Sequence, residues 1–262
     1  MKEKVRVFKI GGKVIDNEEL LIQFLRDFAK IDGKKILIHG GGKIATSISE
    51  KLGITTQMVN GRRITDKDTI DVVVMVYGGL INKKIVAALQ SLGCNAVGLS
   101  GADLNIVFAK KRPVVSVDYG FVGDVEQVNH ETLGMLLGYD IVPVLAPLSH
   151  DGHGQMLNIN ADTIAAVAAV GLSKLFEVEL FYCFEKPGVL MDQHDDSSVI
   201  KKVTPSYFIE LKNQGVVSDG MLPKLENSFE CIQNGVKKVI ICHFSAIGQL
   251  GEAHFPGTVL FG

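Results

Sequence analysis

The sequence predicts an α/β fold with a mainly parallel sheet and an antiparallel β-hairpin inserted near the middle of the chain. Short apolar β-type runs alternate with amphipathic helical stretches from the first residues onward, which is typical of βαβ units. The alternation stops after residue 99 and resumes at residue 140, and short β runs between turn residues fill the interval. With 47% hydrophobic residues in 262, the chain can bury a large core.

The N-terminal part supplies the first βαβ units. Each expected strand is a short apolar run, and each expected helix repeats apolar residues at helical spacing. In chain order these are strand 5–10, helix 18–31, strand 35–39, helix 43–52, a long helical stretch within 66–92 and strand 96–99. Because helices join successive strands, we expect the strands to run parallel.

The inserted hairpin follows. Its β runs, at 107–108, 114–117 and 122–125, are separated by Arg112-Pro113 and Tyr119-Gly120, which favour turns. We expect this insert to form a lid or a pocket wall.

The βα alternation then continues to the C-terminus. The expected elements are strand 140–145, helix 161–170, strand 180–184, helices 205–213 and 222–234, strand 238–242 and strand 258–261. A boundary near residue 172 divides the chain into an N-terminal lobe, 1–172, and a C-terminal lobe, 173–262. No linker separates them, so we expect two lobes of one sheet in a single structural domain.

Composition argues against several classes of function. The net charge is −2 and no basic run is interleaved with aromatic residues, so we expect no nucleic-acid surface. The four cysteines form no C-x-x-C pair, which fits reduced thiols in a cytoplasmic protein. No export signal is visible, and no uninterrupted apolar run reaches the roughly 18 to 20 residues that span a bilayer. The expected partners are small molecules, with no membrane.

Two glycine clusters at strand ends are candidate anion sites. Lys9-Ile10-Gly11-Gly12 follows the first strand and His39-Gly40-Gly41-Gly42 follows the second. Glycine lets backbone N–H groups approach a phosphate or carboxylate, and a helix that starts just beyond adds its positive dipole end. The P-loop pattern is absent. Gly40, Gly42 and Ala45 fit a weak dinucleotide pattern, so an NADP-dependent oxidoreductase stays open as an alternative.

Three later segments place charged or amide side chains at helix starts. Arg63 lies in a turn before the long helix, where a guanidinium could bind a carboxylate. Asn158-Ile159-Asn160-Ala161-Asp162 opens an apolar helix, and Asp162 needs cationic partners if it faces the core. Lys224 lies in a helical first turn, which disfavours a cation unless an anion is near. The His/Asp loops at 150–153 and 192–196 lack metal-site spacing, so no metal site is expected.

Together with Val97-Gly98-Leu99-Ser100-Gly101, these segments resemble the acetylglutamate kinases of the amino acid kinase family, in order and over essentially the whole chain. The K-x-G-G start is shared with aspartate, carbamate and uridylate kinases. The N-G-x-R-x-T segment at 60–65 and the N-x-N-A-D segment at 158–162 are more specific to the acetylglutamate branch.

The resemblance implies a three-layer αβα sandwich whose N-terminal lobe binds the acylated amino acid and whose C-terminal lobe binds ATP. It implies that Lys9 and Lys224 stabilise the transferring phosphoryl group while Asp162 holds both lysines. It also implies that Gly41, Gly42, Arg63 and Asn158 bind the acylglutamate, that Gly11 and Gly12 approach the nucleotide phosphates, and that Mg²⁺ is held mainly through those phosphates. A γ-carboxylate, with a pKa near 4.3, is ionised at neutral pH, so no catalytic base is needed.

Two departures from the family pattern leave the nucleotide site and the identity of the acyl group open. Phe184-Glu185-Lys186 stands where the family usually has Thr/Ser-Asp, so Glu185 would replace the nucleotide-site aspartate. The 100–104 segment lacks the lysine and glycine common in the family, which keeps a larger acyl group, such as succinyl, open. A non-catalytic amino-acid or nucleotide sensor of the same fold is the other alternative.

The oligomeric state is predicted from the start of the sequence. Only four residues precede the first strand, whereas arginine-inhibited hexameric relatives carry an N-terminal helix there. We therefore expect an arginine-insensitive homodimer.

Overall fold

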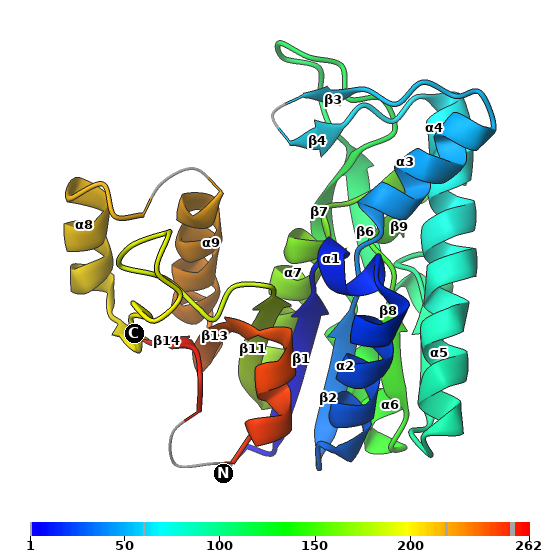
Figure 1. Cartoon of the computed structure of the whole chain (residues 1–262). Coiled ribbons are helices and arrows are strands. Elements are labelled where there is room, and N and C mark those ends of the chain that lie inside the picture. Colours follow the sequence, from blue (N-terminus) through cyan, green and yellow to red (C-terminus); the bar gives the residue numbers. More distant parts are fainter. Residues whose placement is uncertain (1, 60, 218–219, 252–254) are drawn as a thin grey trace.

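A central eight-stranded sheet organises the molecule (Figure 1). The computed structural model describes residues 2–59, 61–217, 220–251 and 255–262, so Asn60 of the N-G-x-R-x-T segment lies outside the described residues. The strand order is β12-β14-β13-β11-β1-β2-β8-β5, and every pairing is parallel except β13 with β14. The strands are β1 Lys4–Ile10, β2 Lys34–Ile38, β5 Ala96–Leu99, β8 Val142–Leu145, β11 Glu177–Phe184, β12 Lys202–Val203, β13 Lys238–His243 and β14 Thr258–Leu260.

Helices cover both faces of this sheet, which confirms the three-layer αβα sandwich. One core joins Phe8 and Phe181 of the sheet to α2 and α5, and the other joins Val7 and Leu180 to α6, α7, α8 and α9. The helices are α1 Gly12–Ile15, α2 Glu18–Lys30, α3 Gly42–Lys51, α4 Lys67–Val73, α5 Asn82–Ser91, α6 His130–Gly138, α7 Ala161–Ser173, α8 Pro205–Asn213 and α9 Met221–Gln233, with short 3₁₀ segments η2 Asp103–Asn105 and η3 Phe244–Gln249. Burial on both faces explains the continuous apolar runs in β2, at Ile36–Ile38, and in β13, at Val239–Cys242.

The expected long helix is present but is not a regular α-helix. A π-helical segment, η1 Val74–Ile81, joins α4 to α5, so that the helix continues from Lys67 to Ser91. Among the described residues it is the one helix long and apolar enough, by length and composition, to cross a membrane. It packs against α2 and strands β5 and β8, and 44% of its most apolar stretch is buried. Those contacts identify it as a core helix that covers the sheet.

The inserted hairpin belongs to a second, four-stranded sheet. β6 Val107–Lys111 pairs antiparallel with β7 Gly123–Val128, and β9 Leu148–His150 with β10 Met156–Asn158 completes the order β10-β9-β6-β7. The strand expected at 114–117 is wrong. That segment is a loop, and Val115 is 90% exposed, because no neighbouring strand or core is there to pair with it.

The loop between β6 and β7 is fixed to the start of the long helix. Thr65 N–H donates to the carbonyl of Tyr119, and Phe121 N–H donates to the carbonyl of Thr65. A two-stranded ribbon, β3 Met58–Val59 with β4 Arg62–Arg63, lies beside them at the same end of the molecule (Figure 1). Both segments therefore overhang the carboxyl ends of the parallel strands.

Candidate active site

The predicted site residues gather at the carboxyl edge of the parallel sheet. α1 follows β1 and α3 follows β2 at this edge, and α7 begins there after β10 (Figure 1). Open α/β sheets commonly bind ligands in the crevice outside the carboxyl ends of their strands. The chain thus brings glycine turns and helix N-termini to one place although they are far apart in the sequence.

Lys9, Asp162 and Lys224 form a charged cluster at this edge. Lys9 Nζ on β1 lies 2.7 Å from Asp162 Oδ1, an ion pair without a well-aligned hydrogen bond. Lys224 Nζ, in the first turn of α9, donates to the other carboxylate oxygen at 2.9 Å. Two ammonium groups and one carboxylate leave one net positive charge, which suits an anionic ligand.

The position of Asp162 follows from the start of α7. Asn160 caps the helix, its Oδ1 accepting from the N–H of Asp162 at 2.7 Å. A carboxylate in the first helical turn is favoured by the helix dipole. Burial would raise the pKa of Asp162, but Lys9 and Lys224 outweigh it and lower the pKa to about 2. The carboxylate stays ionised at neutral pH, so it holds the two lysines and does not act as a base.

A cavity of about 210 Å³ opens beside this cluster. It is bordered by all four residues expected to bind the substrate: Gly41, Gly42, Arg63 and Asn158. Its wall also includes Asn160 and Ala161, which adjoin Asp162 in the chain. None of the residues 100–104 lines this cavity as the structure describes it, and Ser100 donates to Asp103 through its N–H and hydroxyl.

Arg63 is held rigidly at the cavity wall. Its guanidinium donates to the carbonyl of Gly42 at 2.7 Å and to the hydroxyls of Thr46 and Thr56 at 2.8 and 3.2 Å. Only 7% of the residue is exposed. The guanidinium has five N–H donors, so it keeps donor capacity for a carboxylate in the cavity. A pre-positioned arginine loses little entropy on binding.

Gly41 is required by the fold itself. Its φ is +149°, and a Cβ there would lie 2.2 Å from Ile81 Cδ1. A side chain at this position would force α3 away from η1.

Gly11 and Gly12 have different surroundings. A Cβ on Gly11 would lie 3.4 Å from Phe184 Cβ, and one on Gly12 would lie 3.8 Å from Asp16 Oδ2, so the chain's own packing tolerates both. The N–H of Gly11 is not bare as expected, because it donates to the carbonyl of Cys183 at 3.0 Å. Gly12 N–H has no hydrogen-bond partner among the described residues and opens α1.

Glu185 lies just beyond β11, next to the Gly11-Gly12 turn. It forms an ion pair with Lys13 of α1 at 2.8 Å, and both side chains are exposed. Partial burial would raise the pKa of Glu185, but Lys13 outweighs it and lowers the pKa. The structure thus places Glu185 at the same edge without bringing it into the lysine cluster.

A second cavity, of about 230 Å³, lies in the C-terminal lobe beside the start of α9. Its wall is mainly apolar, with Val189, Leu190, Val217 and Met221. Sequence reasoning missed these residues because they come from separate loops and share no periodic pattern. The first turn of α9 lines this slot with Met221 and contributes Lys224 to the lysine cluster.

Two further residues support the substrate cavity and were also missed. Tyr77 lines the cavity from η1, and a Cβ on Gly42 would lie 3.9 Å from both its hydroxyl and Arg63 Nη2. His39 is fully buried, and burial lowers its pKa to about 4. Asn82 Nδ2 donates to His39 Nε2 at 3.1 Å, so the neutral ring donates from Nδ1 to the carbonyl of Gly40 at 2.9 Å. His39 thereby fixes the glycine turn.

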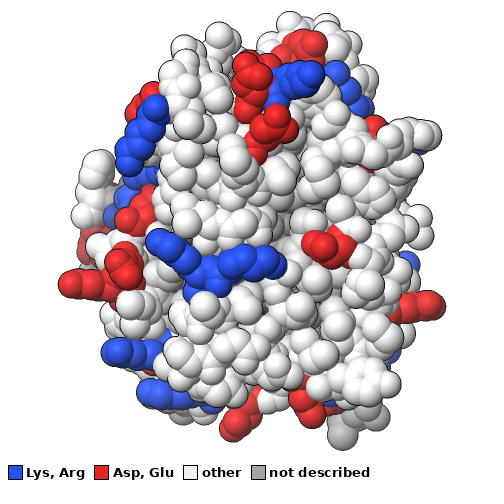
Figure 2. All heavy atoms as spheres, turned by 90° about the vertical axis from the view of Figure 1, so that its right-hand side faces the viewer, with Lys and Arg blue, Asp and Glu red and all other residues white. Residues whose placement is uncertain are grey.

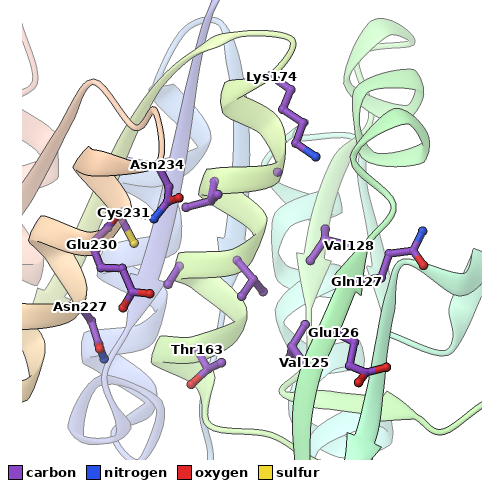
Figure 3. Close-up of a pocket in the computed structure, with 14 residues that line it drawn as sticks. Val125, Glu126, Gln127, Val128, Thr163, Lys174, Asn227, Glu230, Cys231 and Asn234 are labelled. Atoms are coloured by element: carbon purple, nitrogen blue, oxygen red, sulfur yellow. Dashed lines mark hydrogen bonds between the residues drawn. The ribbon is translucent and has the colours of Figure 1, made fainter.

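A third groove, about 390 Å³, lies on the outer side of α7 between β7 and α9 (Figure 3). Lys174 lies at one end and Thr163 at the other. It contains none of the predicted site residues. Burial raises the pKa of its single thiol, Cys231, to about 12, so that thiol is not a nucleophile at neutral pH.

Within the described ranges, no group of three or more His, Cys, Asp or Glu side chains could hold a metal ion.

The sequence of this chain matches a known protein family. The model of the amino acid kinase family matches residues 4–243. The chain is 57% identical over 249 residues to an acetylglutamate kinase of Phocaeicola vulgatus, covering 95% of this chain and 97% of that one. It is 58% identical over 247 residues to an acetylglutamate kinase of Bacteroides thetaiotaomicron, covering 94% and 96%. These matches confirm the predicted resemblance.

Solved structures agree on the fold. A carbamate kinase from Giardia lamblia bound to AMP-PNP superposes with a TM-score of 0.70 at 15% identity, covering 99% of this chain and 98% of that one. An N-acetylglutamate synthase from Neisseria gonorrhoeae, complexed with coenzyme A and N-acetyl-glutamate, gives a TM-score of 0.83 at 20% identity, covering 100% and 60%. This chain belongs to the amino acid kinase family.

Proposed function

We propose that this phosphotransferase transfers the γ-phosphoryl group of ATP to the side-chain carboxylate of an N-acylglutamate, N-acetyl-L-glutamate or N-succinyl-L-glutamate, in arginine biosynthesis. The observation that carries the proposal is the Lys9–Asp162–Lys224 cluster beside the cavity formed by Gly41, Gly42, Arg63 and Asn158. The high identity to acetylglutamate kinases supports the same reaction.

The acylglutamate is oriented by groups with unused bonding capacity. Its α-carboxylate binds Arg63 and the free N–H groups at the start of α3. Asn158 Nδ2 donates to Thr65 Oγ1 at 3.1 Å, which leaves its carbonyl oxygen for the amide N–H of the acylated nitrogen. This orientation directs the γ-carboxylate past Ala161 toward Asp162 and its two lysines.

The nucleotide occupies the C-terminal lobe. The apolar slot formed by Val189, Leu190, Val217 and Met221 suits a planar base, and the phosphates run from there past Gly12 to Lys224. The N–H of Gly12, which has no hydrogen-bond partner among the described residues, supports this path. Mg²⁺ bound through the phosphates would neutralise part of their charge.

The reaction needs positioning and charge neutralisation. A γ-carboxylate oxygen attacks the γ-phosphorus, the bond from that phosphorus to the β,γ-bridging oxygen breaks, and ADP leaves with the electron pair. No proton moves, because the attacking carboxylate is already ionised. Lys9 and Lys224 lie where negative charge builds up on the transferring group, and Asp162 fixes their positions.

A coupled ADP-release assay with N-acetyl- and N-succinylglutamate tests the proposal. Turnover that requires the acylglutamate supports it, and no turnover of either compound overturns it. Binding of both ligands without turnover would instead indicate a sensor of the same fold. Fluorescence titration with NADPH tests the oxidoreductase alternative, for which we expect no binding.

We also propose a cytoplasmic homodimer. Figure 2 shows that the central part of the face on the α5 side has few charged side chains, apart from a basic band across its middle and an acidic group beside that band. Met75 and Leu80 of η1 are exposed on the long helix, and β5 is the edge strand beside it. An apolar surface next to an open edge strand suits a second copy of the chain. Light scattering should give a dimer, and a monomer or a hexamer would contradict this.

A further inference from the structure

Arg62 is a cation at the substrate cavity without a partner. It precedes Arg63 on β4, and neighbouring residues of a strand point to opposite sides. Arg63 turns inward to Gly42 and the threonines, whereas Arg62 is exposed and still borders the cavity. Arg62 makes no hydrogen bond or ion pair with any residue that the structure describes.

The charges around the cavity are unbalanced. Its wall contains two arginines and no aspartate or glutamate. In the proposed substrate orientation, the α-carboxylate uses Arg63 and the γ-carboxylate faces Lys9 and Lys224. An acetyl group carries no charge and ends in a methyl group, so beyond its carbonyl oxygen it offers Arg62 no acceptor. A hydrogen-bonding cation beside an uncharged methyl group gains no binding energy from its charge.

We propose that Arg62 binds a carboxylate at the far end of the acyl group, so that the preferred substrate is glutamate acylated with a dicarboxylic acid, as in N-succinylglutamate. This inference rests on the proposed function. The planar guanidinium can bind such a carboxylate through two parallel N–H bonds. Met58 and Val122, which also line the cavity, supply apolar contact for the methylene carbons in between. Arg62 is then a specificity residue that touches the substrate but not the reacting atoms.

Steady-state kinetics with three acylglutamates test this. The compounds are N-succinyl-, N-acetyl- and N-butanoylglutamate; the butanoyl group has the same number of carbons as succinyl, with a methyl group in place of the terminal carboxylate. The wild-type chain should have the highest kcat/KM with N-succinylglutamate. Arg62→Gln should lower that value roughly tenfold to a hundredfold, mainly through KM, while the two uncharged substrates change less than about threefold. Arg62→Lys should restore part of the preference.

Arg26→Gln is the matched control, because it removes an exposed arginine from α2, away from the cavity. It should leave all three kcat/KM values unchanged. Equal effects of Arg62→Gln on all substrates, or a wild-type preference for N-acetylglutamate, would overturn the inference and leave the proposed function intact. No turnover of any acylglutamate would instead overturn the proposed function.

Discussion

Replacing Asp162 with asparagine should destabilise the fold by an amount that depends on pH. The pKa of Asp162 falls from the ordinary 3.8 to about 2, because Lys9 and Lys224 outweigh the effect of burial. Since one pKa unit corresponds to about 1.4 kcal/mol, the ionised carboxylate contributes about 2 kcal/mol to folding at neutral pH. Asp162→Asn keeps the size of the side chain and removes this contribution.

The sign of the pH dependence follows from the lowered pKa. A carboxyl that ionises more readily in the folded state stabilises fully above its unfolded pKa, near 4, and loses the contribution as the pH falls toward 2. About half of it remains at pH 3. The difference between wild type and Asp162→Asn should therefore shrink from about 2 kcal/mol at pH 7 to about 1 kcal/mol at pH 3.

Urea unfolding followed by circular dichroism at both pH values measures this difference. Asp71→Asn is the control, because Asp71 is an exposed carboxylate on α4 for which the described residues provide no ion pair. It should change the free energy of unfolding by less than about 0.5 kcal/mol at either pH. A difference for Asp162→Asn that does not vary with pH, or that equals the Asp71→Asn value, would refute the reasoning.

Three other substitutions separate the roles of the site. Lys224→Ala should lower kcat roughly a hundredfold or more with little change in KM, whereas the exposed control Lys201→Ala should leave kcat unchanged. Normal turnover of Lys224→Ala would contradict the proposed role of Lys224. Arg63→Ala should raise the KM for the acylglutamate about tenfold or more. It should also lower the melting temperature, since three hydrogen-bond acceptors lose their donor. An unchanged KM would contradict a role of Arg63 in substrate binding. Gly12→Ala should leave the melting temperature unchanged or raise it, because alanine is more favourable than glycine in a helix by about 1 kcal/mol. The same substitution should lower kcat/KM for ATP. Unchanged kinetics would show that Gly12 does not contact the phosphates.

Local patterns predicted the parallel sheet and the need of Asp162 for cationic partners. The run before Lys9 and the glycines after it mark the end of a central strand, and parallel topology then brings that end close to Asp162 at the start of α7. The pairing of Asp162 with two lysines came from the family resemblance, and the distances of 2.7 and 2.9 Å agree with it.

Features that depend on tertiary neighbours were not predictable in this way. Val114 and Val115 have strand propensity, but no partner strand is present, so they form a loop. The hydrogen bond from Gly11 N–H to Cys183 depends on the β1–β11 pairing, which spans more than 170 residues. The apolar slot formed by Val189, Leu190, Val217 and Met221 combines residues from separate loops, so no periodic pattern of apolar residues in the sequence predicts it.

Trapping of the product by hydroxylamine tests the central proposal most directly. An acyl phosphate reacts with hydroxylamine to give a hydroxamate, so the chain should form hydroxamate and ADP in equal amounts from ATP, Mg²⁺ and an N-acylglutamate. N-acetylglutamine, whose γ-carboxylate is replaced by an amide, should give neither product. ADP release without hydroxamate, or equal ADP release with N-acetylglutamine, would contradict phosphorylation of the γ-carboxylate.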